Sequence, residues 1–183
     1  MNPHDDYQLY EFCMDCSVED FRQLVKNSPD AKVLENKQAI LGAAMIGNIE
    51  LLHYFFTSPE TQTYHSTYND WLDEIIAYTA QGGRVEPIRY LCTSPDLSKK
   101  PDLSYKNHDA FKTACTHEDV DLVHFFLTQK IAFTPDTEDW LATTPYAYIY
   151  DEAKMLFDIE TNFQTLKNKL DTTNQSQSVK RKI

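Results

Sequence analysis

Two short stretches contain the residue types that bind metals or act as nucleophiles. In the first, CMDC, Cys13 and Cys16 have a spacing found in zinc sites, but a structural zinc site needs two further ligands. The other candidates, Cys92, Cys115 and His117, belong to other units of the repeat described below. On a helix, Cys13 and Cys16 would share a core-facing stripe. We therefore interpret them as core residues, and we expect no metal or cofactor.

The second stretch, CTHEDVD, brings Cys115 close to His117 in the sequence, a combination that occurs in thiolate catalysis. Cys115 falls at a position that the repeat reserves for small core residues, whereas His117 falls in a turn, so the two side chains should diverge. Glu118 and Asp119 are explained as acids at the start of a helix, where the dipole favours them. We find no phosphate-binding glycine loop and no Ser-His-Asp signature. We expect no catalytic residues; an enzyme with a Cys/His site between repeats is the alternative.

Large aromatic residues in the segments between the apolar runs are better candidates for function. Aromatic side chains of this kind dominate the hot spots of protein interfaces. We predict that six of them contact a partner: Tyr64, Tyr68, Trp71, Tyr105, Phe133 and Trp140.

Two interpretations are open for the tryptophans. Trp71 and Trp140 either contact the partner or pack across helix starts, with Asp70 and Asp139 as helix caps. The three tyrosines are expected to be exposed. A second candidate surface is the acidic face of the second helices, which includes Glu50, His53, Asp121 and His124.

The elements that must position these residues form a repeat. Three segments align without gaps: AILGAAMIGNIELLHYFFTSPE from Ala39, IIAYTAQGGRVEPIRYLCTSPD from Ile75, and AFKTACTHEDVDLVHFFLTQKI from Ala110. Small residues coincide at Ala44, Ala80 and Cys115, and turn residues coincide at Gly47, Gly83 and Glu118. Two weaker copies flank these segments, around Cys16 and near Asp151. The chain therefore contains about five units.

Each unit predicts a helix, a short turn and a second helix. The second segments carry apolar residues at i, i+3, i+6 and i+7, the pattern of one buried helix face. These residues are Ile49, Leu52, Phe55 and Phe56, then Val85, Ile88, Leu91 and Cys92, then Val120, Val123, Phe126 and Leu127. Helices this short are unstable alone and must stack on their neighbours. The fold class is therefore all-α, a helix-turn-helix solenoid.

A Ser-Pro-acid sequence closes three of the apolar runs, with prolines at Pro29, Pro59 and Pro95. Proline lacks an N–H and its ring clashes with the preceding turn, so it ends a helix. We interpret each Ser-Pro as the stop of a second helix. The alternative is proline-directed phosphorylation, at the serines Ser28, Ser58 and Ser94.

The residues of these units resemble the ankyrin repeat. The resemblance rests on the period, the paired small residues and glycine turn of GAAMIGNIELLHYFF, and the threonine-proline in TTPYAY at Thr143–Tyr148. It covers roughly Tyr7 to Glu160. The first three units lack the family's Thr-Pro-Leu-His start, and Ser-Pro-acid replaces its Gly-Ala-Asp ending. The resemblance implies a non-catalytic scaffold that binds another protein through inter-repeat segments and first helices.

The composition and net charge of the chain indicate which class of partner it binds. The 183 residues contain only four glycines, which argues for helices. They carry a formal charge of −11, so we do not expect a nucleic acid as ligand and expect instead a basic patch on another protein. An acidic inhibitor or immunity protein that mimics nucleic acid is a further alternative.

The ends of the chain carry separate expectations. We place the repeat domain at 1–163 and a basic polar tail at 164–183, disordered at its end. The first residues show no Sec-type signal, and no apolar run is long enough for a bilayer. Free thiols fit a cytoplasmic location. We expect a monomer. Delivery into a host cell as an effector is the alternative location.

Overall fold

The computed structural model describes residues 2, 4–28 and 32–180, with side chains as far as residue 171. Within these residues all regular secondary structure is helical, which confirms the all-α class. The elements are α1 (Asp6–Asp15), α2 (Val18–Asn27), η1 (Val33–Glu35), α3 (Lys37–Ile46), α4 (Ile49–Thr57), η2 (Pro59–Tyr64), α5 (His65–Gln81), α6 (Val85–Thr93), α7 (Tyr105–Thr116), α8 (Val120–Thr128), α9 (Pro135–Thr143) and α10 (Ala147–Lys180).

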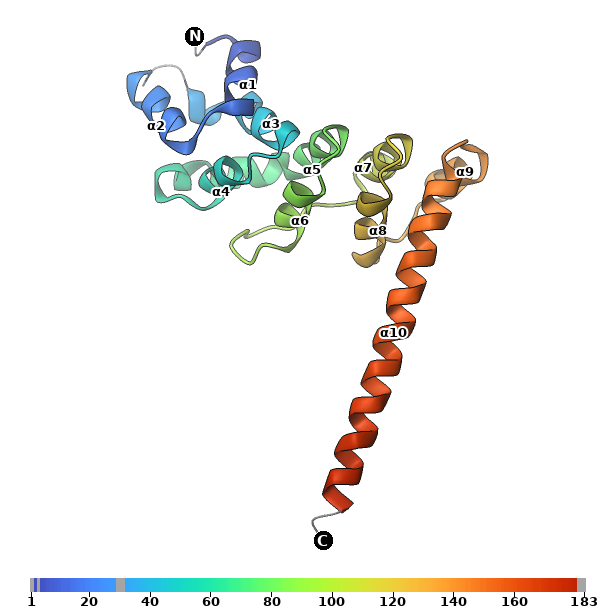
Figure 1. The fold of residues 1–183 in the computed structure, drawn as a ribbon. Helices are drawn as coiled ribbons and strands as arrows, with labels where there is room; N and C mark the ends of the chain where they lie inside the picture. Colours follow the sequence, from blue (N-terminus) through green and yellow to red (C-terminus); the bar gives the residue numbers. More distant parts are fainter. Residues whose placement is uncertain (1, 3, 29–31, 181–183) are drawn as a thin grey trace.

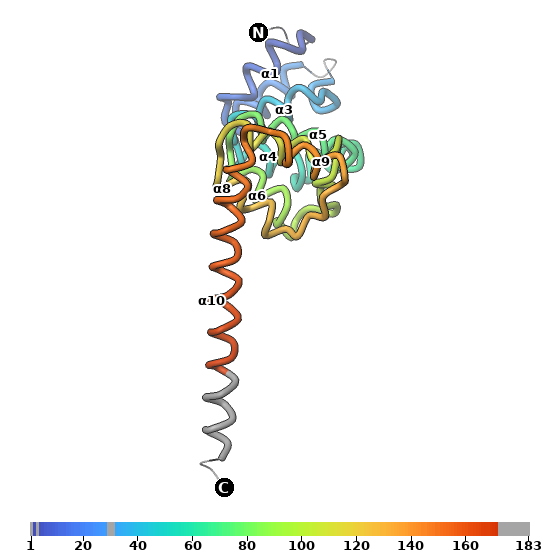
Figure 2. Tube along the Cα trace, turned by 90° about the vertical axis from the view of Figure 1, so that its right-hand side faces the viewer, coloured from blue at the N-terminus to red at the C-terminus, as the bar shows by residue number. Residues whose placement is uncertain are grey.

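The helices are arranged as pairs that stack in a row (Figure 1). The first helices α1, α3, α5 and α7 each pack on the next, and the second helices α2, α4, α6 and α8 do the same. Helix α10 packs along α8 and then extends away from the array (Figures 1 and 2). Each pair therefore buries its apolar face mainly against its neighbours in the row.

Small residues let the first helices approach closely. Ala44, Ala80 and Cys115 are completely buried in α3, α5 and α7, as the gapless alignment predicts. Gly42 marks the tightest contact, because a Cβ atom placed there would lie 2.3 Å from the Tyr10 carbonyl oxygen of α1. Helix α3 can pack on α1 in this way only with glycine at that position.

The turn between the two helices of a pair has the same backbone conformation in three successive pairs. Gly47, Gly83 and Glu118 all have positive φ, at 86°, 62° and 57°. The N–H of the next residue closes the turn in two of them: Asn48 donates to the Ala43 carbonyl at 2.8 Å, and Asp119 donates to the Ala114 carbonyl at 3.0 Å. The positions that the sequence alignment superposes are therefore equivalent in structure as well.

The Ser-Pro-acid sequences end the second helices, as predicted. Helices α2, α4 and α6 stop at Asn27, Thr57 and Thr93, and the serine of each motif is the C-terminal cap residue. Ser58 and Ser94 also accept a hydrogen bond from the N–H of the acid two residues on. Both serines are buried, at 8% and 7% exposure, which gives no support to phosphorylation at these two sites. Pro29 and Asp30 lie outside the described residues.

Two interpretations of the segments between the helix pairs are not supported by the structure. The segment from Thr61 to Trp71 is not an irregular connector, because η2 leads directly into the long helix α5. Asp70 and Asp139 do not cap helices but lie inside α5 and α9. The cap of α9 is Thr134, whose side chain accepts from the Thr137 N–H, and α5 begins without a side-chain cap.

The predicted boundary between residues 163 and 164 falls inside a helix. Helix α10 runs without a break through residue 164, where we predict the basic tail to begin, and continues to Lys180. The last three residues, 181–183, lie outside the described part of the chain. No helix in that part has the length and apolar character needed to cross a bilayer.

Candidate protein-binding surface

The predicted aromatic anchors are used mainly in packing. Tyr68 is completely buried, and its hydroxyl donates to the Leu34 carbonyl at 2.6 Å. Its ring lies edge-on to Phe55 and Phe56 of α4, with centroids 5.7 and 6.0 Å away. The expected exposure of Tyr68 is therefore wrong. The reason is that α5 begins earlier than predicted, so Tyr68 falls on its core-facing side.

The other five anchors are half-buried and fall into separate groups. Tyr64 and Trp71 flank Tyr68, at centroid distances of 6.1 and 5.9 Å, while Phe133 packs on Phe111 at 4.8 Å. Trp71 and Trp140 each lie under a lysine of the preceding first helix, and both Nζ-to-centroid distances are 5.9 Å. These lysines are Lys37 and Lys112. Tyr105 is half-buried at the start of α7, with the Lys106 Nζ 5.2 Å from its ring centroid.

A groove lies across the second helices α2, α4 and α6. Its volume is about 660 Å³. It is lined by Val18 and Arg22 of α2, by Ile49, Glu50, His53, Tyr54 and Thr57 of α4, by Ser58 and Pro59, and by Tyr90 of α6. Two of these residues, Glu50 and His53, belong to the second-helix face that the sequence offers as the alternative surface.

The helical repeat of α4 explains how one short helix serves both the core and the groove. Leu51, Leu52, Phe55 and Phe56 face the core and are buried. Ile49, His53 and Thr57 follow one another at intervals of four residues, and this spacing places them on a single stripe that lines the groove. The groove is thus a direct product of the amphipathic pattern of the second helix.

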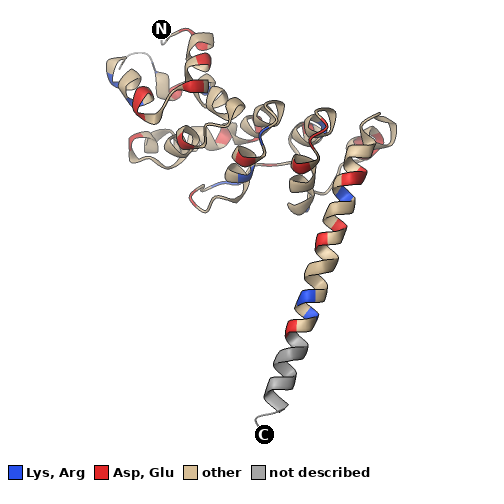
Figure 3. Cartoon of the chain, in the orientation of Figure 1, with Lys and Arg blue, Asp and Glu red and all other residues tan. Residues whose placement is uncertain are grey.

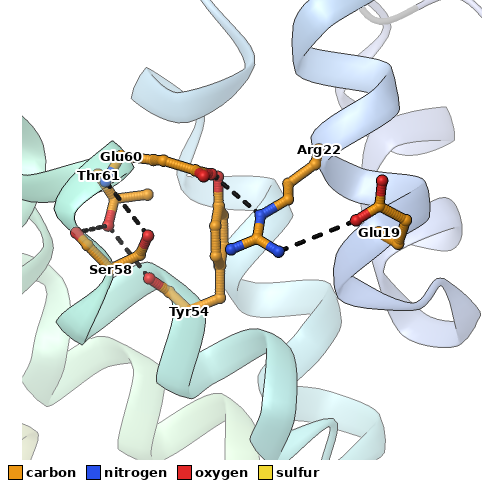
Figure 4. Close-up of polar contacts among 6 residues, drawn as sticks. All are labelled: Glu19, Arg22, Tyr54, Ser58, Glu60 and Thr61. Carbon is orange, nitrogen blue, oxygen red and sulfur yellow. Dashed lines mark hydrogen bonds and ion pairs between the residues drawn. The ribbon is translucent and has the colours of Figure 1, made fainter.

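One wall of the groove is fixed by a polar network that links three elements (Figure 4). The Glu60 carboxylate of η2 accepts from Arg22 Nε of α2 at 3.0 Å and from the Tyr54 hydroxyl of α4 at 2.9 Å. The Arg22 guanidinium also lies over the Tyr54 ring, 5.1 Å from its centroid, and Glu19 lies 3.9 Å from Arg22 Nη1. Thr61 closes the base of η2 by donating to the Tyr54 carbonyl.

The network shifts the pKa values of Tyr54 and Glu60 in opposite directions. Burial, together with the hydrogen bond to Glu60, raises the pKa of Tyr54 to about 12. The hydrogen bonds from Tyr54 and Arg22 lower the pKa of Glu60. Tyr54 is therefore a neutral donor and Glu60 a carboxylate at neutral pH. The resulting charge-assisted hydrogen bonds hold α2, α4 and η2 in register.

The other wall is formed by a contact between α4 and α6. His53 Nδ1 and the Tyr90 hydroxyl lie 3.1 Å apart, and the two rings meet edge to face at 6.1 Å. Burial raises the pKa of Tyr90 to about 12, so its hydroxyl remains protonated. His53 itself is exposed, so one side of its ring is open to a ligand in the groove.

The rim of the groove is acidic. Glu50 lines the groove and is exposed, and Glu19 and Glu60 flank Arg22 on the α2 side. Figure 3 shows that acidic residues are distributed along the helix pairs, in keeping with the formal charge of −11. The arrangement combines an apolar floor with an anionic edge, which suits a cationic side chain with a long aliphatic stem.

The Cys/His alternative gains no support from the geometry. Cys115 is completely buried, and burial raises the pKa of its thiol to about 12, whereas His117 is exposed at the end of α7. Cys13 is also completely buried, with a pKa raised by a hydrogen bond with Cys16 and by burial. No group of three His, Cys, Asp or Glu side chains with the arrangement of a metal site occurs among the described residues.

One buried polar cluster is not foreseen from the sequence. His108 of α7 is completely buried, with Nδ1 3.0 Å from the Thr137 hydroxyl of α9. That hydroxyl donates to the Asn107 carbonyl at 3.0 Å. His108 and the two residues before it have positive φ, so α7 opens with a left-handed turn. The cluster links the fourth helix pair to the fifth through buried hydrogen bonds, so we interpret its role as structural.

Comparison of the chain with protein-family models, with curated proteins and with solved structures finds no match.

Proposed function

We propose that this chain is a non-catalytic scaffold of stacked helix pairs, ankyrin-like in type, that binds another protein through the groove across α2, α4 and α6. The observation that carries the proposal is the groove itself. Three successive second helices contribute to it, its floor is apolar, and its rim carries exposed carboxylates. The ankyrin type is supported by the period of the units and by their equivalent left-handed turns.

The groove is suited to a segment that presents lysine or arginine. Its two basic lining residues are Arg22, which is paired with Glu60, and His53, which contacts Tyr90, so Glu50 on the rim is the charge that faces an incoming ligand. A basic side chain can lay its stem along Ile49 and Tyr90 and bring its charge to Glu50. A rigid wall lowers the ordering cost of binding such a segment.

The proposal is tested with a library of basic, neutral and acidic peptides and with two charge-reversal variants. Glu50→Lys should weaken the best basic peptide by about tenfold or more, because a rim attraction becomes a repulsion in a partly desolvated site. Glu138→Lys makes the same charge change at an exposed position of α9 that does not line the groove, and it should leave binding within about twofold.

Two further measurements complete the test. Binding should weaken as ionic strength rises, since exposed charges are screened beyond the Debye length. His53→Ala should also reduce affinity while leaving the thermal transition in place, because His53 is exposed. Equal loss of binding in Glu50→Lys and Glu138→Lys would show that net charge, and not the groove, attracts the peptide.

A further inference from the structure

Helix α10 carries an apolar stripe that the array does not cover. Its members are Leu156, Ile159, Phe163, Leu166 and Leu170, and their exposed fractions range from 38% to 64%. The first two turns of the helix, by contrast, bury Ile149 and Ala153. Figures 1 and 2 show α10 leaving the array beyond this contact. A contiguous exposed apolar surface of this kind marks an interaction site.

The spacing of the stripe identifies the kind of partner. The five residues follow one another at intervals of three, four, three and four, which is the a and d pattern of a coiled coil. A core-facing helix of a globular domain carries a wider apolar face than this narrow stripe. The stripe therefore fits a second helix that lies nearly parallel or antiparallel to α10.

The charged residues that flank the stripe favour the antiparallel orientation. In the standard heptad, Leu156, Phe163 and Leu170 occupy a, so Glu160 and Lys167 both occupy e. The acids Asp158 and Glu160 lie in the half near the array, and the bases Lys167 and Lys169 lie in the distal half. In parallel copies each e position faces a g position of the other copy, so Glu160 would lie opposite Met155 and Lys167 opposite Asn162, and no ion pair would form. Antiparallel copies place each Glu160 opposite the other copy's Lys167, because equivalent e positions face each other in that orientation.

We infer that α10 mediates an antiparallel homodimer, in which Phe163 of one copy packs against Leu166 of the other, and Ile159 against Leu170. The two helix arrays then lie at opposite ends of the seam. This inference departs from the sequence analysis, which expects a monomer. The grooves on α2, α4 and α6 stay clear of the seam, so dimer formation and peptide binding can be tested separately.

The seam is tested by sedimentation equilibrium over a concentration series of the full chain. The parent protein should change from monomer to dimer with concentration, as mass action requires. Phe163→Asp should weaken the dimer at least about tenfold, since it places a charge in a central apolar layer. Thr161→Asp adds the same charge on the opposite side of α10 and should have no effect. A parent chain that stays monomeric at the highest concentration would refute the inference.

Orientation is tested by exchanging the charges. Glu160→Lys and Lys167→Glu should each weaken self-association by about tenfold, because both facing pairs become like-charged. An equal mixture of the two variants should associate as well as the parent, since every Lys then faces a Glu. The double variant E160K/K167E should also recover, which controls for the contact of Glu160 with His124. A mixture that associates no better than either variant alone would refute the antiparallel orientation.

Discussion

At the scale of single residues, the turn inside each helix pair depends on one backbone conformation. Gly47 and Gly83 adopt positive φ at no steric cost, whereas Glu118 adopts it with a Cβ atom. The left-handed conformation costs an ordinary residue roughly 1–2 kcal/mol. The third of these turns is therefore held by its surroundings, including the hydrogen bond from the Asp119 N–H to the Ala114 carbonyl.

Replacing this residue with glycine should stabilise the protein. We expect Glu118→Gly to raise the free energy of unfolding by about 0.5–1 kcal/mol, because the steric relief exceeds the entropy that glycine adds to the unfolded chain. Gly83→Ala is the matched control: no atom lies within 4 Å of the added Cβ, so it should lose about 1 kcal/mol from backbone strain alone. Urea unfolding of both variants gives the measurement. A destabilised Glu118→Gly would contradict this explanation.

The buried His108 should make stability depend on pH. Burial and the nearby Lys112 lower its pKa, while the Ala132 carbonyl and Asp102 oppose the shift. The unfolded chain then binds the proton more tightly than the folded chain, so the contribution of His108 is complete above its ordinary pKa of 6.5 and decreases as pH falls below that value.

The measurement is the urea midpoint at pH 7.5, 6.5 and 5.5, about one unit to either side of the ordinary histidine pKa. We expect the parent to lose stability over this interval and His108→Gln to lose less. His117→Gln, at an exposed histidine that ends the same helix, should keep the parent's slope. Parallel slopes for the parent and His108→Gln would rule out this residue as the source.

Sequence reasoning reaches the turn residues more readily than the buried polar cluster. The alignment places Glu118 at a glycine position, so its conformation follows from local pattern. His108 depends on Thr137, which lies 29 residues further along the chain. Its burial is set by how α7 and α9 pack, and no local spacing encodes that contact. The exposure of Tyr68 is mispredicted for a similar reason. Helix α5 begins at His65 within a polar stretch, so the local sequence does not indicate that Tyr68 lies on the buried side of a helix.

At the scale of helices, close approach between the first helices accompanies the groove across the second helices. First helices carry glycine and alanine where they meet, and Gly42 lies against the α1 backbone. Second helices carry larger side chains such as Tyr54, Tyr90 and Phe125. The small residues and the periodic apolar stripes are visible in the sequence. The groove is not, because its walls come from contacts between helices, such as that of Arg22 with Glu60.

Alanine at Gly42 should separate intrinsic helix preference from packing. In an exposed helix the change stabilises by about 1 kcal/mol. Here the added Cβ would lie 2.3 Å from a backbone carbonyl, so α3 must move away from α1. We expect a net loss of about 1–3 kcal/mol, the usual cost of overpacking. Thermal unfolding gives the answer, and a raised melting temperature would show that the contact is not tight.

At the scale of the whole molecule, α10 divides into a part that belongs to the array and a part that does not. Ile149 and Ala153 are buried, whereas all of residues 158–171 are exposed. The predicted boundary between residues 163 and 164 thus falls inside a continuous helix, but it comes close to this change in burial. The basic composition after residue 164 is visible in the sequence, whereas the continuation of the helix beyond it is not.

Ending the chain after Phe163 should leave the array intact. The removed residues that have described side chains, 164–171, are exposed, so we expect the free energy of unfolding to change by no more than about 0.5 kcal/mol. The comparison is made at a concentration at which the parent is monomeric, by urea unfolding followed by circular dichroism. A loss of several kcal/mol would mean that the distal part of α10 stabilises the array.

The projection of α10 also has a mechanical consequence. The stretch from Leu156 to Leu170 spans about 21 Å at 1.5 Å per residue. Helix α10 is attached to the array mainly by its contacts with α8, and also contacts α7 and α9. A sideways force on the far end of α10 acts on these contacts through the whole length of the projecting helix, so the load at the contacts is larger than the applied force. The load is concentrated around Ile149 and Ala153, so the fifth helix pair would detach before the inner pairs yield.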